Sequence, residues 1–133
     1  MIRYREGYKY QLVEDYYHAL QVIRPEVFIF SNFIRLDTTG DLWIIAGYAW
    51  DGPSGPAFDT PNFMRASLVH DALYQLMRSG HLPQSLRGEA DEEMRRICLA
   101  AGMSKLRAWW CWSGVRFFGG AAAREAQPVR EAP

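Results

Sequence analysis

The sequence predicts an α+β fold in which a small antiparallel β-sheet is followed by three α-helices. Residues ~8–46 contain short runs of aromatic and β-branched residues separated by turn residues, a pattern typical of β-strands joined by turns. After residue 61, apolar residues recur at the three- and four-residue spacing of amphipathic helices. The 133 residues suit a single domain, which we place at residues 1–120, with residues 121–133 as a flexible tail.

The clearest signal for the sheet is a hairpin. Apolar runs at residues 33–36 and 42–45 flank the turn residues 37–41. Residues 8–13 and 27–30 are two further runs rich in strand-forming residues. The pattern therefore predicts one antiparallel sheet of three or four strands.

Three helices are predicted, at residues ~62–78, ~89–101 and ~104–118. Pro61 fits the first position of the first helix, and Ser104 fits the N-cap of the third. Gly80 and Gly102 follow the first two helices, where glycine commonly ends a helix. A loop rich in glycine and proline, at residues 47–59, separates the sheet from the helices.

Charge and cysteine content exclude several classes of function. The 15 basic and 15 acidic residues balance, so no nucleic-acid partner is expected. Cys98 and Cys111 fall on successive predicted helices and are expected to be reduced. The N-terminal stretch lacks the apolar core of a signal peptide, and no run approaches the ~20 apolar residues of a transmembrane helix. We therefore expect an intracellular protein.

His70 and Asp71 stand side by side in the first predicted helix and need partners, because buried polar groups are costly unless paired. On a helical wheel His70 lies at the centre of the apolar face, and Asp71 lies about 100° away at the polar edge. Asp91 lies on the inward face of the next helix, so two antiparallel helices bring it opposite His70. A carboxylate bonded to one imidazole nitrogen leaves the other nitrogen to act as a base. The alternative interpretation is a structural hydrogen bond between helices.

Asp71 is expected to face the end of the glycine- and proline-rich loop, which also contains Asp51. Carboxylates and backbone carbonyls are the ligands that Ca²⁺ prefers. We therefore predict a calcium site formed by Asp71 and Asp51 with the loop carbonyls of Gly52 and Gly55.

The two other histidines are expected at the surface. His81 lies in a predicted loop, and His18 lies near the end of a predicted strand. One alternative to the calcium site is a zinc site formed by His70, His81 and a carboxylate.

The third helix is predicted to contact a partner. Its apolar positions are Leu106, Trp109, Trp110 and Phe117, and Trp112 stands apart from them. Such a helix packs on the core with one side and contacts another protein with the other, so phage structural subunits or a second copy of the chain are the expected partners. Contact with a membrane interface is the alternative, because basic residues accompany the tryptophans.

Four segments carry a resemblance to a known family: residues 47–56 (GYAWDGPSGP), 68–74 (LVHDALY), 89–91 (EAD) and 115–119 (VRFFG). In this order they resemble a small phage- and prophage-associated family known as domain of unknown function 1353. The resemblance covers most of residues 8–120. It implies an origin in a bacteriophage or prophage and no particular activity.

The glycine-rich loop, the HD-x-x-Y helix and the later aspartate are also similar to the motif of secreted phospholipase A2. This similarity implies that His70 activates water, that Asp91 orients His70, and that Asp71 binds Ca²⁺ with carbonyls of the loop. Tyr74 stands where that family has a supporting tyrosine. The helices of that family are stapled by disulfides, whereas no cysteine flanks the HD pair here, so the similarity is local.

Two functions are consistent with these observations. The first is an accessory or virion-associated protein of a phage or prophage, in which His70, Asp71 and Asp91 link the loop to the helices. The alternative is a phage-encoded hydrolase directed at lipid or cell wall, with a His70–Asp91 dyad. Both imply location in the virion or in the cytoplasm of the infected bacterium.

Overall fold

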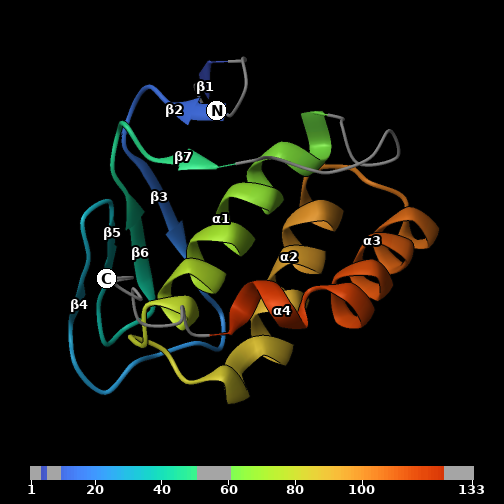
Figure 1. Cartoon of the computed structure of the whole chain (residues 1–133). Helices are drawn as coiled ribbons and strands as arrows, with labels where there is room; N and C mark the ends of the chain where they lie inside the picture. The colour runs from blue at the N-terminus through green and yellow to red at the C-terminus, as the bar shows by residue number, and fades with distance from the viewer. Residues whose placement is uncertain (1–3, 6–9, 51–60, 125–133) are drawn as a thin grey trace, which may run out of the picture.

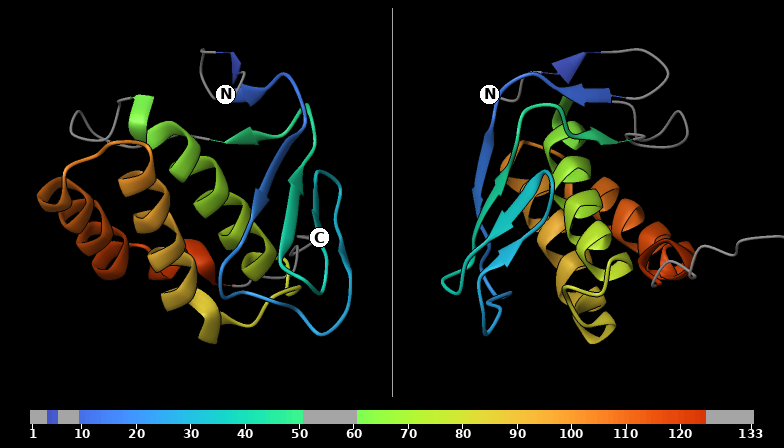
Figure 2. Two further views of the ribbon diagram at one scale, coloured as in Figure 1. Left: turned by 180° about the vertical axis from the view of Figure 1, so that it is seen from behind. Right: turned by 60° about the vertical axis from the view of Figure 1, so that its left-hand side comes forward.

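The structure is a computed structural model, which describes residues 4–5, 10–50 and 61–124 (Figure 1). In this part of the chain, seven short strands precede the α-helices. The strands lie together on one side of the molecule and the helices pack against them from the other, as the views in Figures 1 and 2 show. The predicted α+β order is therefore confirmed.

The strands form two antiparallel sheets. They are β1 (Tyr4–Arg5), β2 (Tyr10–Leu12), β3 (Tyr16–Ala19), β4 (Ile29–Phe30), β5 (Ile34–Leu36), β6 (Asp41–Ile44) and β7 (Ala49–Trp50). The larger sheet has the order β3-β6-β5-β4, and the smaller has the order β1-β2-β7. The expectation of a single sheet was wrong.

Two bends in the chain explain why one sheet becomes two. Gly47 has a φ of 100°, which an extended strand cannot adopt, so β6 and β7 are separate strands. Opposite this bend, the chain also turns between β2 and β3, and the Asp15 carboxylate accepts the Ala46 N–H at 2.7 Å in place of a strand partner. A backbone hydrogen bond still joins the two bent segments, since the Leu12 N–H donates to the Tyr48 carbonyl at 2.8 Å.

The hairpin predicted at residues 33–45 is confirmed as β5 and β6. Its turn is held by Asp37, whose side chain accepts the N–H groups of Thr39 and Asp41, each at 3.0 Å. Gly40 has a φ of 89°, and a Cβ there would lie 3.0 Å from the Leu20 carbonyl oxygen. The turn therefore needs glycine both for its backbone conformation and for space.

The helices lie within a few residues of the predicted ranges. They are α1 (Pro61–Arg78), α2 (Arg87–Ala100), α3 (Lys105–Phe118) and α4 (Gly120–Ala123), with a 3-10 turn, η1 (Gln84–Leu86), before α2. Gly80 and Gly102 have φ angles of 79° and 93° after α1 and α2, and the Ser104 hydroxyl accepts the Arg107 N–H at 3.2 Å. The predicted ends of these helices are thus formed as the residue types indicate.

The packed part of the chain extends beyond residue 120. We assigned residues 121–133 to a flexible tail, but α4 covers residues 120–123, and the Ala123 side chain is fully buried. The Ala123 carbonyl also accepts a hydrogen bond from the Gln84 side chain at 2.9 Å. Residues 125–133 lie outside the described part.

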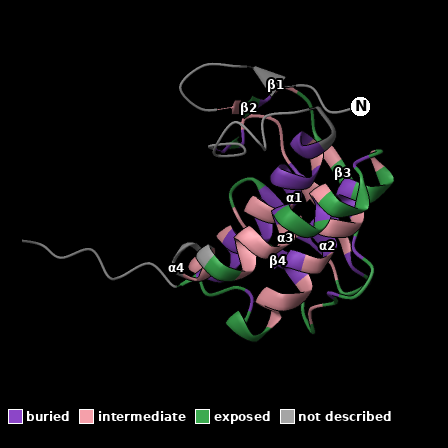
Figure 3. Ribbon diagram, turned by 90° about the vertical axis from the view of Figure 1, so that its right-hand side faces the viewer, coloured by how far each residue is buried: buried purple, intermediate pink, exposed green. Residues whose placement is uncertain are grey.

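Helix α1 lies at the centre of the core, between the larger sheet and α2 (Figure 1). Its side chains are mostly buried, as Figure 3 shows. The fully buried apolar ones are Ala66, Leu68, Val69, Ala72, Leu73, Leu76 and Met77. Because these residues surround the helix on more than one face, the polar side chains of α1 that face its neighbours must find partners within the protein.

Helix α3 packs on the core with its small residues, and its predicted apolar stripe lies on the outer side. Leu106, Trp109, Trp110 and Phe117, which we expected to form its apolar stripe, are each at least half exposed. The buried positions are Ala108 and Cys111, with Trp112 and Val115 packed against the core. Small residues allow α3 to approach α2 closely, whereas two tryptophans at this contact would hold the helices apart.

Candidate functional site

The structure confirms that His70 and Asp91 meet. His70 lies near the middle of α1, Asp91 lies in the second turn of α2, and these two helices are extensively packed. The His70 Nε2 atom lies 2.7 Å from the Asp91 Oδ1 atom, which is hydrogen-bond distance. The helical spacing therefore placed both side chains on the correct faces.

Asp91 is fully buried and accepts hydrogen bonds from three side chains. The Tyr74 hydroxyl donates to Oδ1 at 2.5 Å, and the Arg116 Nη1 group donates to Oδ2 at 2.9 Å. Burial alone would raise the pKa of Asp91, but the hydrogen bonds from His70, Tyr74 and Arg116 outweigh it and lower the pKa below its ordinary value. Asp91 is therefore an anion at neutral pH.

Tyr74 connects this carboxylate to the end of α3. Its hydroxyl accepts a hydrogen bond from the Arg87 Nε group at 3.1 Å. Arg87 also donates through Nη2 to the carbonyls of Val115 and Arg116, at 2.8 and 2.7 Å. These carbonyls lie in the last turn of α3, where a cation is favoured. Burial and the Asp91 carboxylate raise the pKa of Tyr74, so Tyr74 stays a neutral donor.

Sequence analysis missed the two arginines of the site. Arg87 is the first residue of α2, and Arg116 lies in the last turn of α3. The available signal was electrostatic: a carboxylate predicted to be buried needs a cation, and Arg116 lies in one of the four segments that carry the family resemblance. Spacing within α1 and α2 could not show which cation would reach Asp91.

His70 retains limited access to solvent. Its side chain is 13% exposed, and its ring lies 4.1 Å from the Tyr74 ring between centroids. Nδ1 makes no hydrogen bond to a residue in the described part of the chain. Because ionised Asp91 can only accept, the Nε2 atom carries a proton, and in the neutral imidazole Nδ1 has the lone pair.

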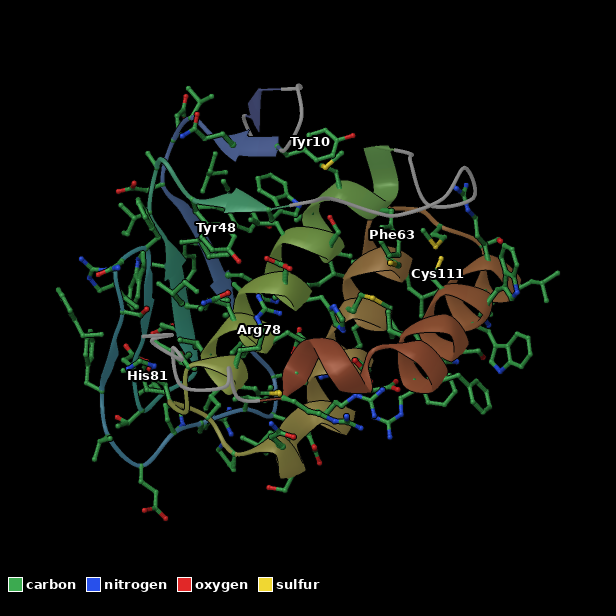
Figure 4. The ribbon with its side chains drawn as sticks, in the orientation of Figure 1. Tyr10, Tyr48, Phe63, Arg78, His81 and Cys111 are labelled. Carbon is green, nitrogen blue, oxygen red and sulfur yellow. The ribbon has the colours of Figure 1, made fainter. Side chains whose placement is uncertain are left out.

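Asp71 lies apart from this group, at the edge of α1 that faces the strands. The Tyr48 hydroxyl, from the bend between β6 and β7, donates to its Oδ2 atom. Figure 4 shows Tyr48 between the strands and α1. The prediction that His70 and Asp71 have different partners is thus confirmed, although the partner of Asp71 described here is a tyrosine.

The predicted metal ligands are only partly within the described residues. Asp51, Gly52 and Gly55 lie outside them. Among residues 4–5, 10–50 and 61–124, no three or more His, Cys, Asp or Glu side chains are arranged to hold a metal ion. Within these residues the zinc alternative finds no ligand set: His81 is exposed, and its Nδ1 atom lies 2.8 Å from the Ser79 hydroxyl.

A second buried carboxylate joins α2 to the larger sheet. The Glu93 Oε2 atom lies 3.0 Å from His18 Nε2, and Oε1 accepts the Gln21 N–H and the Arg96 Nη2 group, each at 3.0 Å. Glu93 is 2% exposed, so His18 is a structural partner and not the simple surface residue we expected. Burial would raise the pKa of Glu93, but these hydrogen bonds lower it to about 2.

Comparison with known proteins identifies the family. The model of a family described as "Protein of unknown function (DUF1353)" matches residues 38–115, which include His70, Tyr74 and Asp91. The chain belongs to this family. No curated protein and no solved structure matches the chain. Since the DUF1353 description states no activity, any functional argument has to come from the site itself.

Proposed function

We propose that this DUF1353 protein is a hydrolase in which His70 is the general base. The observation that carries the proposal is the His70–Asp91 pair, with Nε2 bonded to a buried anion and Nδ1 left as the basic nitrogen. The local similarity to secreted phospholipase A2 supports the same assignment of roles. The substrate class is an ester or amide of lipid or cell wall.

The reaction would use one ring nitrogen of His70, Nδ1, first as a base and then as an acid, while Nε2 stays bonded to Asp91. Nδ1 of His70 takes a proton from water while the water oxygen forms a bond to the carbonyl carbon of the substrate. The imidazolium so formed is stabilised by Asp91, which Tyr74 and Arg116 hold in place. Nδ1 then returns the proton to the leaving oxygen or nitrogen as its bond to that carbon breaks.

The proposal assigns a calcium ion to Asp71. Carboxylates and backbone carbonyls are the donor set that Ca²⁺ takes, and the ion would polarise the substrate carbonyl. Of the proposed ligands, the described residues supply Asp71 alone, which already accepts a hydrogen bond from Tyr48. Calorimetric titration with Ca²⁺, with Asp71→Asn as the control, tests this assignment separately from the dyad.

Activity assays on matched histidine variants test the proposed base. The wild-type chain, His70→Gln and His81→Gln are assayed on phospholipid vesicles for fatty-acid release and on peptidoglycan for soluble fragments, with and without Ca²⁺. His70→Gln is expected to lower kcat by at least about 100-fold, the usual contribution of a general base. His81→Gln, an exposed loop histidine, is expected to leave kcat unchanged. Equal activity of wild type and His70→Gln would refute the proposal.

The second candidate is an accessory or virion-associated protein of a bacteriophage or prophage. It is favoured by the span of the polar network, since Asp91, Tyr74 and the two arginines link α1, α2 and α3. In that case wild type shows no turnover, while His70→Ala and Asp91→Ala each cost about 3–5 kcal/mol of stability. Mass spectrometry of purified virions would test the location.

A further inference from the structure

The outer side of α3 is unusually apolar for a surface that faces solvent. We define the α3 outer face as Leu106, Trp109, Trp110 and Phe117, which are between 51% and 83% exposed. Leu106, Trp110 and Phe117 follow one another at spacings of four and seven residues, so they share one stripe of the helix, and Trp109 lies beside it. In Figure 3 the exposed side of α3 faces the viewer. Single exposed apolar residues are ordinary, but a continuous stripe of this kind indicates an interaction surface.

The charged residues that α3 itself contributes are all cations, of which Arg116 is paired with Asp91. Residues 103–124 contain four cations, Lys105, Arg107, Arg116 and Arg124, and no acidic residue, although the chain as a whole balances 15 basic and 15 acidic residues. Lys105 and Arg107 lie in the same first turn as Leu106, and Arg107 lines a shallow hollow with Leu106 and both exposed tryptophans. A partner with negative charge that also accepts apolar side chains is therefore the one that complements α3.

We propose that the α3 outer face docks on an anionic lipid bilayer. Tryptophan is favoured at the boundary between headgroups and acyl chains, where its ring enters the apolar region and its N–H stays near water. Lysine and arginine beside the apolar stripe meet the negative headgroups. No helix of the described residues is long and apolar enough to cross a membrane, so docking places α3 in the plane of the interface.

A second apolar surface shows why charge decides the partner. Val27, Phe28 and Phe30, at the edge strand β4, are also more than half exposed. Glu26 adjoins them in the sequence, and the Arg35 guanidinium lies 3.7 Å from the centroid of the Phe30 ring. This surface has mixed charge and gives no preference for an anionic partner. It is therefore a matched control for apolar exposure with charges of both signs.

Flotation of the full chain with vesicles tests the proposal, which stands whether or not the chain hydrolyses a substrate. Vesicles of phosphatidylcholine alone are compared with vesicles that contain one part of phosphatidylglycerol to three parts of phosphatidylcholine. We expect binding to the anionic vesicles. The double variant Leu106→Gln, Trp109→Gln should lower the partition coefficient at least about tenfold, because apolar burial contributes in proportion to area. The control variant Val27→Gln, Phe28→Gln should bind as the wild type does.

The cations provide a separate measurement. Lys105→Gln should lower binding to anionic vesicles about fivefold and leave binding to neutral vesicles unchanged. His70→Gln should bind as the wild type does, which separates docking from the proposed hydrolysis. Far-UV circular dichroism checks that each variant is folded.

Three results would overturn the proposal. The first is that the wild type does not bind anionic vesicles. The second is that Val27→Gln, Phe28→Gln lowers binding as much as Leu106→Gln, Trp109→Gln does. The third is that Lys105→Gln leaves binding to anionic vesicles unchanged. A dimer in sedimentation that Leu106→Gln, Trp109→Gln dissociates, together with no vesicle binding, would show instead that the face contacts a second copy.

Discussion

Replacement of Glu93 by glutamine should change the pH dependence of stability in a defined direction. The pKa of Glu93 is lowered from 4.5 to about 2 in the folded protein. Above pH 4.5 the carboxylate is ionised in both folded and unfolded states, and its full stabilisation is present. Below pH 4.5 the unfolded chain binds a proton that the folded chain does not, so stability is lost until the pH reaches about 2.

The size of this effect follows from the two pKa values. Each pH unit between them corresponds to about 1.36 kcal/mol at 25 °C, so the interval from 4.5 to about 2 gives about 3 kcal/mol. Glu93 is 2% exposed, so solvent screens its interactions only weakly. Its side-chain partners are His18 and Arg96, each at 3.0 Å.

Urea denaturation at several pH values between 7 and 2 measures the effect. The difference in unfolding free energy between wild type and Glu93→Gln should be constant above pH 5 and shrink by about 3 kcal/mol toward pH 2. Glu92→Gln is the control, because Glu92 is 39% exposed in a surface pair with Arg95 and should contribute less than about 1 kcal/mol. A difference for Glu93→Gln that does not vary with pH would refute the reasoning.

Three further predictions concern the packing around the site. Tyr74→Phe should cost about 1–3 kcal/mol in urea denaturation, because buried Asp91 loses a donor, and an unchanged midpoint would contradict this. Gly119→Ala should cost about 1–3 kcal/mol, since its Cβ would lie 2.5 Å from the Val115 carbonyl oxygen and 3.0 Å from the Tyr74 hydroxyl. Gly88→Ala, with 3.6 Å to the nearest atom, should not destabilise. Burial raises the pKa of Cys98 to about 12, so a thiol reagent at neutral pH should label it only after unfolding, and fast labelling of the folded chain would oppose the assigned burial.

Local pattern was enough to predict the central pair of the site. The positions of His70 and Asp91 depend on helical spacing within α1 and α2 and on a short connection between them, and sequence specifies both. Arg87 and Arg116 were not found, because they reach Asp91 and Tyr74 only through the docking of helix ends. Which groups a long side chain reaches depends on how neighbouring helices pack together. The spacing of residues within one helix gives no information about that packing.

The orientation of α3 shows a different limit of prediction from sequence. Periodicity identified the stripe of Trp109, Trp110 and Phe117 correctly, but it could not tell whether that stripe faces the core or the solvent. Ala108 and Cys111 on the other side were the deciding residues. Figure 4 shows Cys111 between α2 and α3, where a larger side chain would force the helices apart.

The two buried carboxylates of α2 have a consequence for how freely this helix can turn about its own axis. Asp91 and Glu93 are two positions apart, so they project in directions about 200° apart, one toward α1 and α3 and the other toward the sheet. An apolar stripe such as Ala90, Met94 and Ile97 tolerates small changes in azimuth, because packing is not directional. A charge with fixed partners on opposite sides of the helix does not. The azimuth of α2 is therefore held by charge as well as by packing, and with it the position of the oxygen that faces His70.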